Sequence, residues 1–284
     1  MKEGKLGLLK VVPIKEIINE TPADCRLPVK SYSLIIPEIV EKAIPGQFVM
    51  MWLPEVDEKP MGIASCDISE GKLLLAVAKL GKATTEFHKR EKGELLGIRG
   101  PYGKGFTIEG ENIGVIGGGT GIAPSRFLVE RALERGMRVT LFHGAKTANE
   151  LVFQQFFKQL AKKYDNFLYE PSTDDGSFGF HGFTTDCFEA SLNRGTNFDK
   201  IYTCGPELMM YKILVKTHEK KLPLEACLAD RYVKCAIGLC GQCTIDPIGL
   251  RLCIDGPVFN QDQLAKMEDF GKYSRDKFGK KIPF

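Results

Sequence analysis

The sequence lacks the features that would place a chain in a membrane or outside the cell. It has no run approaching the roughly 18 apolar residues that a membrane-spanning helix needs. Its N-terminus, MKEGKLGLLKVVPIKEI, lacks an apolar core followed by a small-residue cleavage site. Internal repeats and low-complexity tracts are also missing, which excludes repeat architectures. We therefore expect a cytoplasmic protein that binds no membrane.

The sequence also has little net charge. Its 39 Lys and Arg residues nearly balance 36 Asp and Glu residues, and the formal net charge is +3. This balance gives no indication of nucleic-acid binding and leaves small or acidic partners open. Hydrophobic residues fill 43% of the 284 positions, enough for two or more cores of ordinary domain size. We expect a multidomain globular protein.

The pattern of the sequence changes twice along the chain. Residues 1–108 contain short β-rich runs broken by Pro and Gly, such as SYSLII and GQFVMMWL, which is typical of an antiparallel barrel or sandwich. Residues 109–224 alternate strand-like and helix-like segments, which predicts an α/β doubly wound parallel sheet. Residues 225–284 are loop-rich and too few to build a large core. We predict three domains with these boundaries.

Four cysteines lie close together in the last segment, within CAIGLCGQCTIDPIGLRLC. They are Cys235, Cys240, Cys243 and Cys253. Their spacing is C-x4-C-x2-C-x9-C, and the first two intervals match the plant-type ferredoxin pattern for a [2Fe-2S] cluster. Gly238 and Gly241 let backbone N–H groups approach and hydrogen-bond the cluster sulfurs. Zinc-bound or unrelated buried thiols are the alternative, but a zinc ribbon needs two C-x2-C pairs and this segment has one.

The remaining cysteines and the histidines carry no such pattern. Nine cysteines is an odd number, and a reducing compartment disfavours structural disulfides, so the clustered thiols indicate metal or redox chemistry. Cys227 lies eight residues before the first proposed ligand but is interpreted, with Cys25, Cys66 and Cys187, as an ordinary small apolar residue. The four histidines are too dispersed to suggest a metal site and are treated as structural.

A glycine-rich turn in the middle segment, within GVIGGGTGIAPSR, lies between a strand-like and a helix-like run. It consists of Gly117, Gly118, Gly119, Thr120 and Gly121. Such a turn offers backbone N–H groups and the positive end of a helix to a pyrophosphate. The strict G-x-G-x-x-G fingerprint is absent, because its third position falls on Ile122. Tight packing of a strand against a helix also selects glycine, so the turn alone leaves both roles open.

Two further stretches favour nucleotide binding in this segment. TCGP, with Cys204, Gly205 and Pro206, follows a strand-like run, and open α/β sheets bind ligands at the carboxyl ends of strands. The Cys204 thiol can pack there against a nicotinamide ring, or it can be a buried structural residue. Asp174 and Asp175 can bond ribose hydroxyls and would repel a 2′-phosphate, which favours NAD over NADP. An acidic turn closed by an Asx hydrogen bond is the alternative.

Taken together, these motifs resemble a known family. PGQFVMMWLP, KPMGIAS, GPYGKGF, GGGTGIAP, DDGSFGFHGF, YTCGPELM and CIDGPVF, with the cysteine spacing, are similar to the electron transfer subunits of NAD-dependent dihydroorotate dehydrogenase, within the ferredoxin reductase superfamily. The resemblance covers nearly the whole chain. It implies an antiparallel β-barrel that holds FAD, an α/β domain that holds NAD and a small C-terminal [2Fe-2S] domain.

The resemblance places flavin contacts on three stretches of the first segment. They are Lys59, Pro60, Met61, Gly62 and Ile63, then Ala76, Val77 and Ala78, and finally Ala83 and Thr84. Several family anchors are changed. Lys59 replaces an Arg and lacks its bidentate fork, and Gly62 replaces a Ser and offers only its backbone N–H. The family's next Arg is Ala78, and Lys79 or Lys82 can supply the charge. FAD is expected with altered contacts, and FMN is the alternative.

The resemblance also implies a function in pyrimidine biosynthesis. Electrons would pass from a partner, the FMN-containing catalytic subunit that oxidises dihydroorotate to orotate, through the cluster and FAD to NAD+. A nicotinamide exchanges two electrons as a hydride, whereas an iron–sulfur cluster accepts one, so the flavin converts between them. No side chain is needed as an acid or base, and no catalytic residue is assigned. Homologous complexes suggest two copies of each subunit.

Two other functions remain open on the sequence alone. A related flavin and iron–sulfur NAD(P)H reductase could deliver electrons to ferredoxin, sulfur species or a hydrogenase, because one electron path serves many acceptors. A non-enzymatic module with a structural zinc site and a vestigial nucleotide pocket is the second. The basic stretch after Leu264 either docks the partner subunit or forms a solvated tail.

Overall fold

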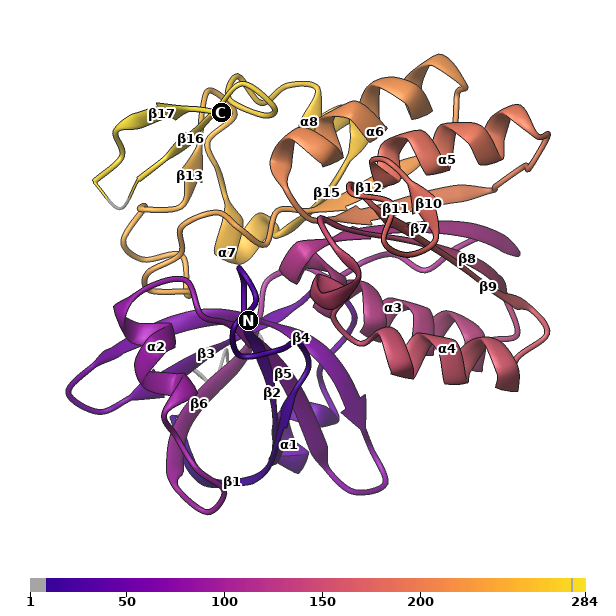
Figure 1. Cartoon of the computed structure of the whole chain (residues 1–284). Helices are drawn as coiled ribbons and strands as arrows, with labels where there is room; N and C mark the ends of the chain where they lie inside the picture. Colours follow the sequence, from indigo (N-terminus) through magenta and orange to yellow (C-terminus); the bar gives the residue numbers. More distant parts are fainter. Residues whose placement is uncertain (1–8, 277) are drawn as a thin grey trace.

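A closed six-stranded antiparallel barrel forms the first part of the computed structural model (Figure 1). Its strand order is β1-β2-β5-β4-β3-β6. The strands are β1 (Lys10–Asn19), β2 (Val29–Ile35), β3 (Phe48–Leu53), β4 (Asp57–Asp67), β5 (Lys72–Ala78) and β6 (Leu95–Tyr102), with short helices α1 (Pro37–Val40) and α2 (Lys82–His88). The structure describes residues 9–276 and 278–284; the start of the predicted barrel domain, residues 1–8, and the basic Lys277 lie outside the described residues.

The β5 strand shows why the sequences of the barrel strands are continuous apolar runs. Leu73, Leu75 and Val77 belong to the core inside the barrel, whereas the alternate residues Leu74 and Ala78 belong to a second core outside it. Side chains of a strand alternate between its two faces, so a strand covered on both sides is apolar at every position. The outer face of the barrel is therefore covered by the middle part of the chain.

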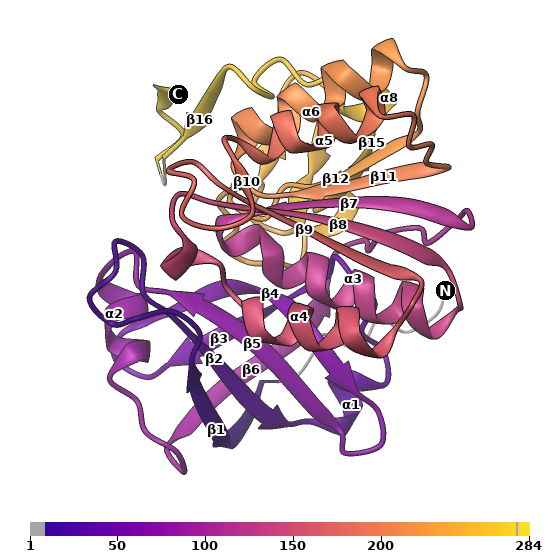
Figure 2. The same cartoon turned by 45° about the vertical axis from the view of Figure 1, so that its right-hand side comes forward.

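The middle part forms a seven-stranded sheet with the order β10-β9-β8-β7-β11-β12-β15 (Figure 2). The strands are β7 (Asn112–Gly118), β8 (Arg138–Ala145), β9 (Phe167–Thr173), β10 (Phe180–His181), β11 (Lys200–Cys204), β12 (Leu224–Cys227) and β15 (Val258–Asn260). All neighbouring pairs are parallel except β12 with β15. The strand order reverses direction between β7 and β11, which is where doubly wound sheets bind their ligands.

Helices cover both faces of this sheet. They are α3 (Ile122–Glu134), α4 (Gln154–Lys163), α5 (Thr184–Asn193) and α6 (Glu207–Glu219), with short 3-10 turns η1 (Gly119–Gly121) and η2 (Ala148–Glu150). Helices α3 and α4 lie between the sheet and the barrel, and α5 and α6 lie on the opposite face (Figure 2). Glu130 on α3 accepts a hydrogen bond from Ser65 of β4 at 2.6 Å, so α3 joins the barrel to the sheet. Within the described part of the chain, no helix is long and apolar enough to span a bilayer.

The last part of the chain contains only short elements. They are β13 (Thr244–Ile245), β14 (Leu250–Arg251), α7 (Leu252–Asp255), α8 (Gln261–Leu264), β16 (Tyr273–Arg275) and β17 (Lys281–Pro283). Strand β15 comes from this part and extends the central sheet, so the two parts share a core; the boundary at residue 224 stays a prediction. Within the basic tail, residues 273–275 pair with residues 281–283 as strands β16 and β17, and Arg275 pairs with Asp246 at 2.9 Å.

Candidate cofactor sites

The glycine-rich turn and the TCGP stretch form one platform at the carboxyl ends of β7 and β11. Cys204 lies directly opposite Gly117 in the parallel pair. A Cβ atom added to Gly121 would lie 2.4 Å from the Cys204 carbonyl oxygen, and one added to Gly205 would lie 2.9 Å from that of Gly118. No real Cβ atom comes so close, so packing alone requires glycine at both positions. The structural role that the sequence left open therefore accounts for these two residues.

Gly119 differs from the other glycines of the platform. Its φ angle is +54°, in the left-handed region that favours glycine, and an added Cβ atom would have no heavy atom within 4 Å. The position that a Cβ atom of Gly119 would occupy therefore lies in open space, just before α3, the helix that follows the turn. A dinucleotide phosphate can approach the backbone N–H groups here, and binding by Gly119 and Thr120 stays a prediction.

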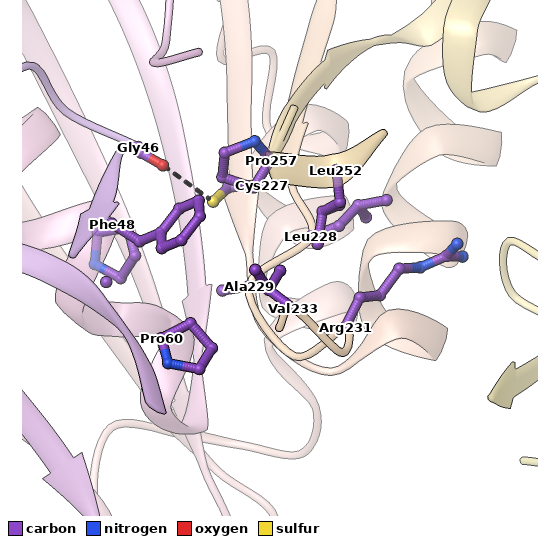
Figure 3. Close-up of a pocket in the computed structure, with 12 residues that line it drawn as sticks. Gly46, Phe48, Pro60, Cys227, Leu228, Ala229, Arg231, Val233, Leu252 and Pro257 are labelled. Atoms are coloured by element: carbon purple, nitrogen blue, oxygen red, sulfur yellow. Dashed lines mark hydrogen bonds between the residues drawn. The ribbon is translucent and has the colours of Figure 1, made fainter. Parts of the chain in front are cut away.

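Cys204 is fully buried, and it lies directly opposite Cys227 on the neighbouring strand β12. The Cys227 thiol, together with burial, raises the pKa of Cys204 well above the ordinary thiol value. A protonated, buried thiol is unreactive, which agrees with a structural role for the strand-end cysteine. Cys227 lines a small cavity with Pro60 and Gly62 of the flavin stretch, and it donates to the Gly46 carbonyl (Figure 3).

The two acidic residues of the middle segment lie in a turn after β9. Oδ1 of Asp175 accepts hydrogen bonds from the backbone N–H and the hydroxyl of Ser177, at 3.0 and 2.6 Å. These bonds lower the pKa of Asp175 and form the Asx turn that was the alternative to a ribose contact. Burial, with the charges of Asp175 and Glu150, raises the pKa of Asp174 against the opposing effect of Lys146. The ribose contact of Asp175 stays a prediction.

A cleft of about 840 Å³ lies between the barrel, the glycine-rich turn and the last part of the chain. Most of the flavin contacts that the resemblance implied line it, together with the turn residue Thr120: Lys59, Pro60, Met61, Gly62, Ala76, Ala78, Ala83 and Thr84. Ile63 and Val77 do not line it, because both are fully buried in the barrel core. Only the backbone of these two residues can contact a flavin. Lys82 lines the cleft and Lys79 does not.

The structure explains the missing hydroxyl at Gly62. A Cβ atom at this position would lie 2.8 Å from Cγ of Pro124, in the first turn of α3. The barrel strand and the nucleotide helix therefore approach each other too closely for a side chain, and the serine of the family pattern has no room here. Lys59, the replacement for the family's arginine, lies 2.5 Å from Asp57.

A third wall of the cleft was not predicted from the sequence. Residues 229–234 line it and connect β12 directly to Cys235, the first cysteine of the cluster motif. Arg231 anchors this wall: it donates two hydrogen bonds to Glu207 at the start of α6 and two to Asp269 in the last part of the chain. Burial raises the pKa of Asp230 to about 6, and the negative charge of Glu207 adds to this effect. The short distance in sequence between Cys227 and Cys235 is the one feature of the sequence that could have predicted this wall.

The four cysteines of the motif lie in one loop, arranged as two pairs. Sγ of Cys243 lies 3.4 Å from Sγ of Cys253, and Cys240 contacts the sulfur of Cys235 through its backbone N–H. Backbone N–H groups donate to two of the sulfurs: those of Leu239 and Cys240 to Cys235 at 3.3 and 3.4 Å, and that of Gly238 to Cys253 at 3.3 Å. Gly238 has φ +73°, a backbone conformation that favours glycine, and this explains why the loop has a glycine at that position.

The pKa values of these thiols follow from the same contacts. Burial acts to raise the pKa of Cys235, but the N–H donors of Cys240 and Ile237 outweigh it and lower the pKa to about 6. Burial and the neighbouring Cys243 thiol raise the pKa of Cys253 to about 12. Among residues 9–276 and 278–284, no group of three or more His, Cys, Asp and Glu is arranged to hold a single metal ion. Paired sulfurs with N–H donors fit a [2Fe-2S] cluster, which takes four thiolates over two irons.

Comparisons with known proteins show which domain families the chain contains. Residues 115–214 match the oxidoreductase NAD-binding domain family, and residues 230–265 match the iron-sulfur cluster binding domain of dihydroorotate dehydrogenase B. A solved structure of an NADH-dependent reduced ferredoxin-NADP oxidoreductase, studied for flavin-based electron bifurcation, superposes with a TM-score of 0.78 at 26% identity, over 94% of this chain and 91% of that chain. A ferredoxin NADP+ reductase from Neisseria gonorrhoeae with bound FAD and NADP shares the fold, with a TM-score of 0.63 at 17% identity over 74% of this chain and 91% of that chain.

Two archaeal relatives are similar over nearly their whole length, and both are named "probable dihydroorotate dehydrogenase B (NAD(+)), electron transfer subunit". The protein of Methanocaldococcus jannaschii is 42% identical over 272 residues, which cover 95% of this chain and 96% of the relative. That of Methanothermobacter thermautotrophicus is 38% identical over 279 residues, covering 98% and 99%. The chain therefore belongs to the family of dihydroorotate dehydrogenase B electron transfer subunits.

Proposed function

We propose that this chain carries electrons between a dihydroorotate-oxidising catalytic subunit and NAD+, in pyrimidine biosynthesis. The observation that carries the proposal is the wall of residues 229–234. It begins beside the nucleotide platform, lines the flavin cleft and ends at Cys235. This short stretch of chain therefore connects the sites that we propose for the dinucleotide, the flavin and the cluster, as an electron path requires.

The proposed site residues act by binding and orientation. When bound, the flavin exchanges electrons in pairs with a nicotinamide and singly with an iron–sulfur cluster. Lys59 and Lys82 supply positive charge to the phosphates of FAD, and Thr84 also lines the cleft. The backbone N–H groups of the Gly119–Gly121 turn face the dinucleotide, and the four paired cysteines hold the cluster.

Arg231 connects the nucleotide platform to the last part of the chain. Its guanidinium is mostly buried, and it binds Glu207, which follows directly after the TCGP stretch. The same guanidinium binds Asp269, in the last part of the chain. Both carboxylates are themselves buried, so the pairs are shielded from solvent. No side chain is required to accept or donate a proton to a substrate, and we assign no catalytic acid or base.

The partner in this proposal is an FMN-containing catalytic subunit, with two copies of each subunit in a cytoplasmic complex. The names of the relatives, which describe an electron transfer subunit, support the existence of such a partner. Dihydroorotate itself would bind the partner and not this chain. The preference for NAD rests on the two acidic residues after β9, and the preference for FAD on the extent of the cleft.

Co-expression with a dihydroorotate-oxidising subunit tests this function. We expect the two chains to co-purify and the complex to reduce NAD+ when dihydroorotate is added. The likeness to the ferredoxin-NADP oxidoreductase favours a second candidate, an NADH reductase that serves ferredoxin. Reduction of ferredoxin by NADH without any response to dihydroorotate would support that candidate and contradict the first.

A further inference from the structure

One arginine connects the flavin barrel to the cluster loop. Arg99 lies on β6, and its Nη1 donates to the backbone carbonyl oxygen of Cys235 at 3.0 Å. The two residues are 136 positions apart in the sequence. Nη1 also donates to the hydroxyl of Tyr102 at 3.1 Å. The first cysteine of the cluster motif is therefore held by a side chain of the barrel.

The orientation of Arg99 is fixed by Glu58 of β4. Nε and Nη2 donate to the two carboxylate oxygens of Glu58 at 2.5 and 2.6 Å, which is the bidentate geometry that arginine forms with a carboxylate. The side chains are only 17% and 25% exposed, so solvent screens the pair poorly. The hydrogen bonds that Arg99 donates to Glu58 raise the pKa of Arg99 above its ordinary value, which keeps the guanidinium charged.

Glu58 also lines the flavin cleft. A continuous series of contacts therefore leads from the cleft through Glu58 and Arg99 to the backbone of Cys235. Adding an electron to a cluster adds negative charge, and a fixed positive charge nearby favours that addition, whereas a fixed negative charge opposes it. Arg99 and Glu58 belong to the same series of contacts but carry opposite charges.

We propose that Arg99 is a positioning residue that fixes the cluster loop against the flavin barrel and raises the reduction potential of the cluster, and that Glu58 orients Arg99 and limits this increase. The inference rests on the proposed function, because it requires the cluster. It makes a prediction that a purely structural ion pair does not make. The two single substitutions that neutralise the pair should shift the potential in opposite directions.

The experiment is an anaerobic redox titration of the full chain, followed by the electron paramagnetic resonance signal of the cluster. We expect Arg99→Gln to lower the midpoint potential and Glu58→Gln to raise it, each by up to a tenfold change in the one-electron equilibrium, which is about 59 mV. Arg99→Lys keeps the charge but loses the bidentate fork. It should therefore retain a potential close to that of the unaltered protein while losing iron faster to a chelator.

Arg131 offers a matched control. It also donates to a backbone carbonyl of the barrel, that of Cys66 at 2.6 Å, and it also pairs with a glutamate, Glu134, but it lies on α3. Arg131→Gln should leave the cluster potential unchanged. Shifts of the same sign in Arg99→Gln and Glu58→Gln, or no shift in either, would overturn the inference. If Arg99→Gln does not fold, a fall or no change in Glu58→Gln is sufficient to overturn it.

Failure of the proposed function gives a different result. In that case the unaltered protein contains no acid-labile sulfide and shows no cluster signal, so both conclusions are lost together. If the protein contains the cluster and transfers electrons but its reduction potential does not depend on Arg99 and Glu58, the inference is contradicted and the proposed function is not.

Discussion

The nucleotide platform and the cluster loop are built by opposite means. The platform lies on buried parallel strands, and Gly121 packs so tightly against the Cys204 backbone that it leaves no space for a methyl group. The loop that carries the four clustered cysteines contains two strands of two residues each and one four-residue helix, and two of its sulfurs accept hydrogen bonds from backbone N–H groups. Apolar burial shapes the first region, whereas the second depends on the group that its thiols bind.

The largest expected effect comes from removing a cluster ligand. Cys253→Ser replaces a fully buried sulfur that lies 3.4 Å from Cys243. We expect the cluster to be lost and electron delivery to the partner to fall at least about 100-fold, because a hydroxyl is a far poorer iron ligand than a thiolate. Flavin-dependent NADH oxidation with ferricyanide should persist, because the platform does not depend on the cluster. Labile-sulfide analysis and the two rates measure this.

Cys25→Ser is the control for this variant, because Cys25 is a half-buried thiol on the barrel whose sulfur contacts the Thr21 hydroxyl. It should keep the full sulfide content. A Cys253→Ser protein with unchanged labile sulfide would show that the loop does not hold a cluster through this residue.

A smaller effect is expected when a methyl group is added to a tightly packed glycine of the nucleotide platform. Gly121→Ala would bring a Cβ atom to 2.4 Å from the Cys204 carbonyl oxygen, so the turn and the TCGP stretch must move apart. We expect a loss of about 1–3 kcal/mol in the free energy of unfolding, measured by urea denaturation without cofactors. Gly81→Ala, where an added Cβ atom meets nothing within 4 Å, should change it by less than about 0.5 kcal/mol. Equal losses in both variants would refute the packing argument.

The sheet should also show a specific pH dependence. His143 on β8 is 1% exposed; its Nδ1 contacts the Tyr169 hydroxyl at 3.0 Å, and burial lowers its pKa to about 3. An unfolded histidine binds a proton near pH 6.5, so below that pH the unfolded chain binds more protons than the folded one. The free energy of unfolding should therefore fall by about 1.4 kcal/mol per pH unit as the pH drops from 6.5 toward 3.

Urea unfolding at pH 7 and at pH 5 measures this contribution. His143→Phe removes the titrating group and should reduce the loss of stability between the two pH values. The same pH dependence in the variant and in the unaltered protein would show that His143 is not the source.

The smallest expected effect concerns the flavin cleft. Lys82→Gln removes a positive charge that lines the cleft, whereas Lys79→Gln removes one that does not. We expect the first to weaken flavin binding about three- to tenfold, most strongly at low salt, and the second to have no effect. Fluorescence titration of the flavin-free protein measures both. Equal weakening in the two variants would indicate a general effect of net charge.

Local patterns predicted much of the fold and the cluster loop. The alternating strands and helices of the middle segment and the cysteine spacing both act over short distances in the sequence, and both agree with the structure. Contacts between distant segments were not predictable in this way. The close approach of Gly62 to Pro124 and the wall around Arg231 depend on how the barrel, sheet and tail pack together. Ile63 and Val77 were placed among the flavin contacts by the family resemblance, and the sequence did not show that their side chains belong to the barrel core.

The most direct test of the account is cofactor analysis of the protein produced with ample iron and without oxygen. Iron, acid-labile sulfide and flavin are measured together, and the visible spectrum is recorded before and after NADH is added. The account predicts the two irons and two sulfides of a [2Fe-2S] cluster and one flavin per chain, with bleaching of the flavin by NADH. A colourless protein that carries zinc, with neither labile sulfide nor flavin, would contradict it.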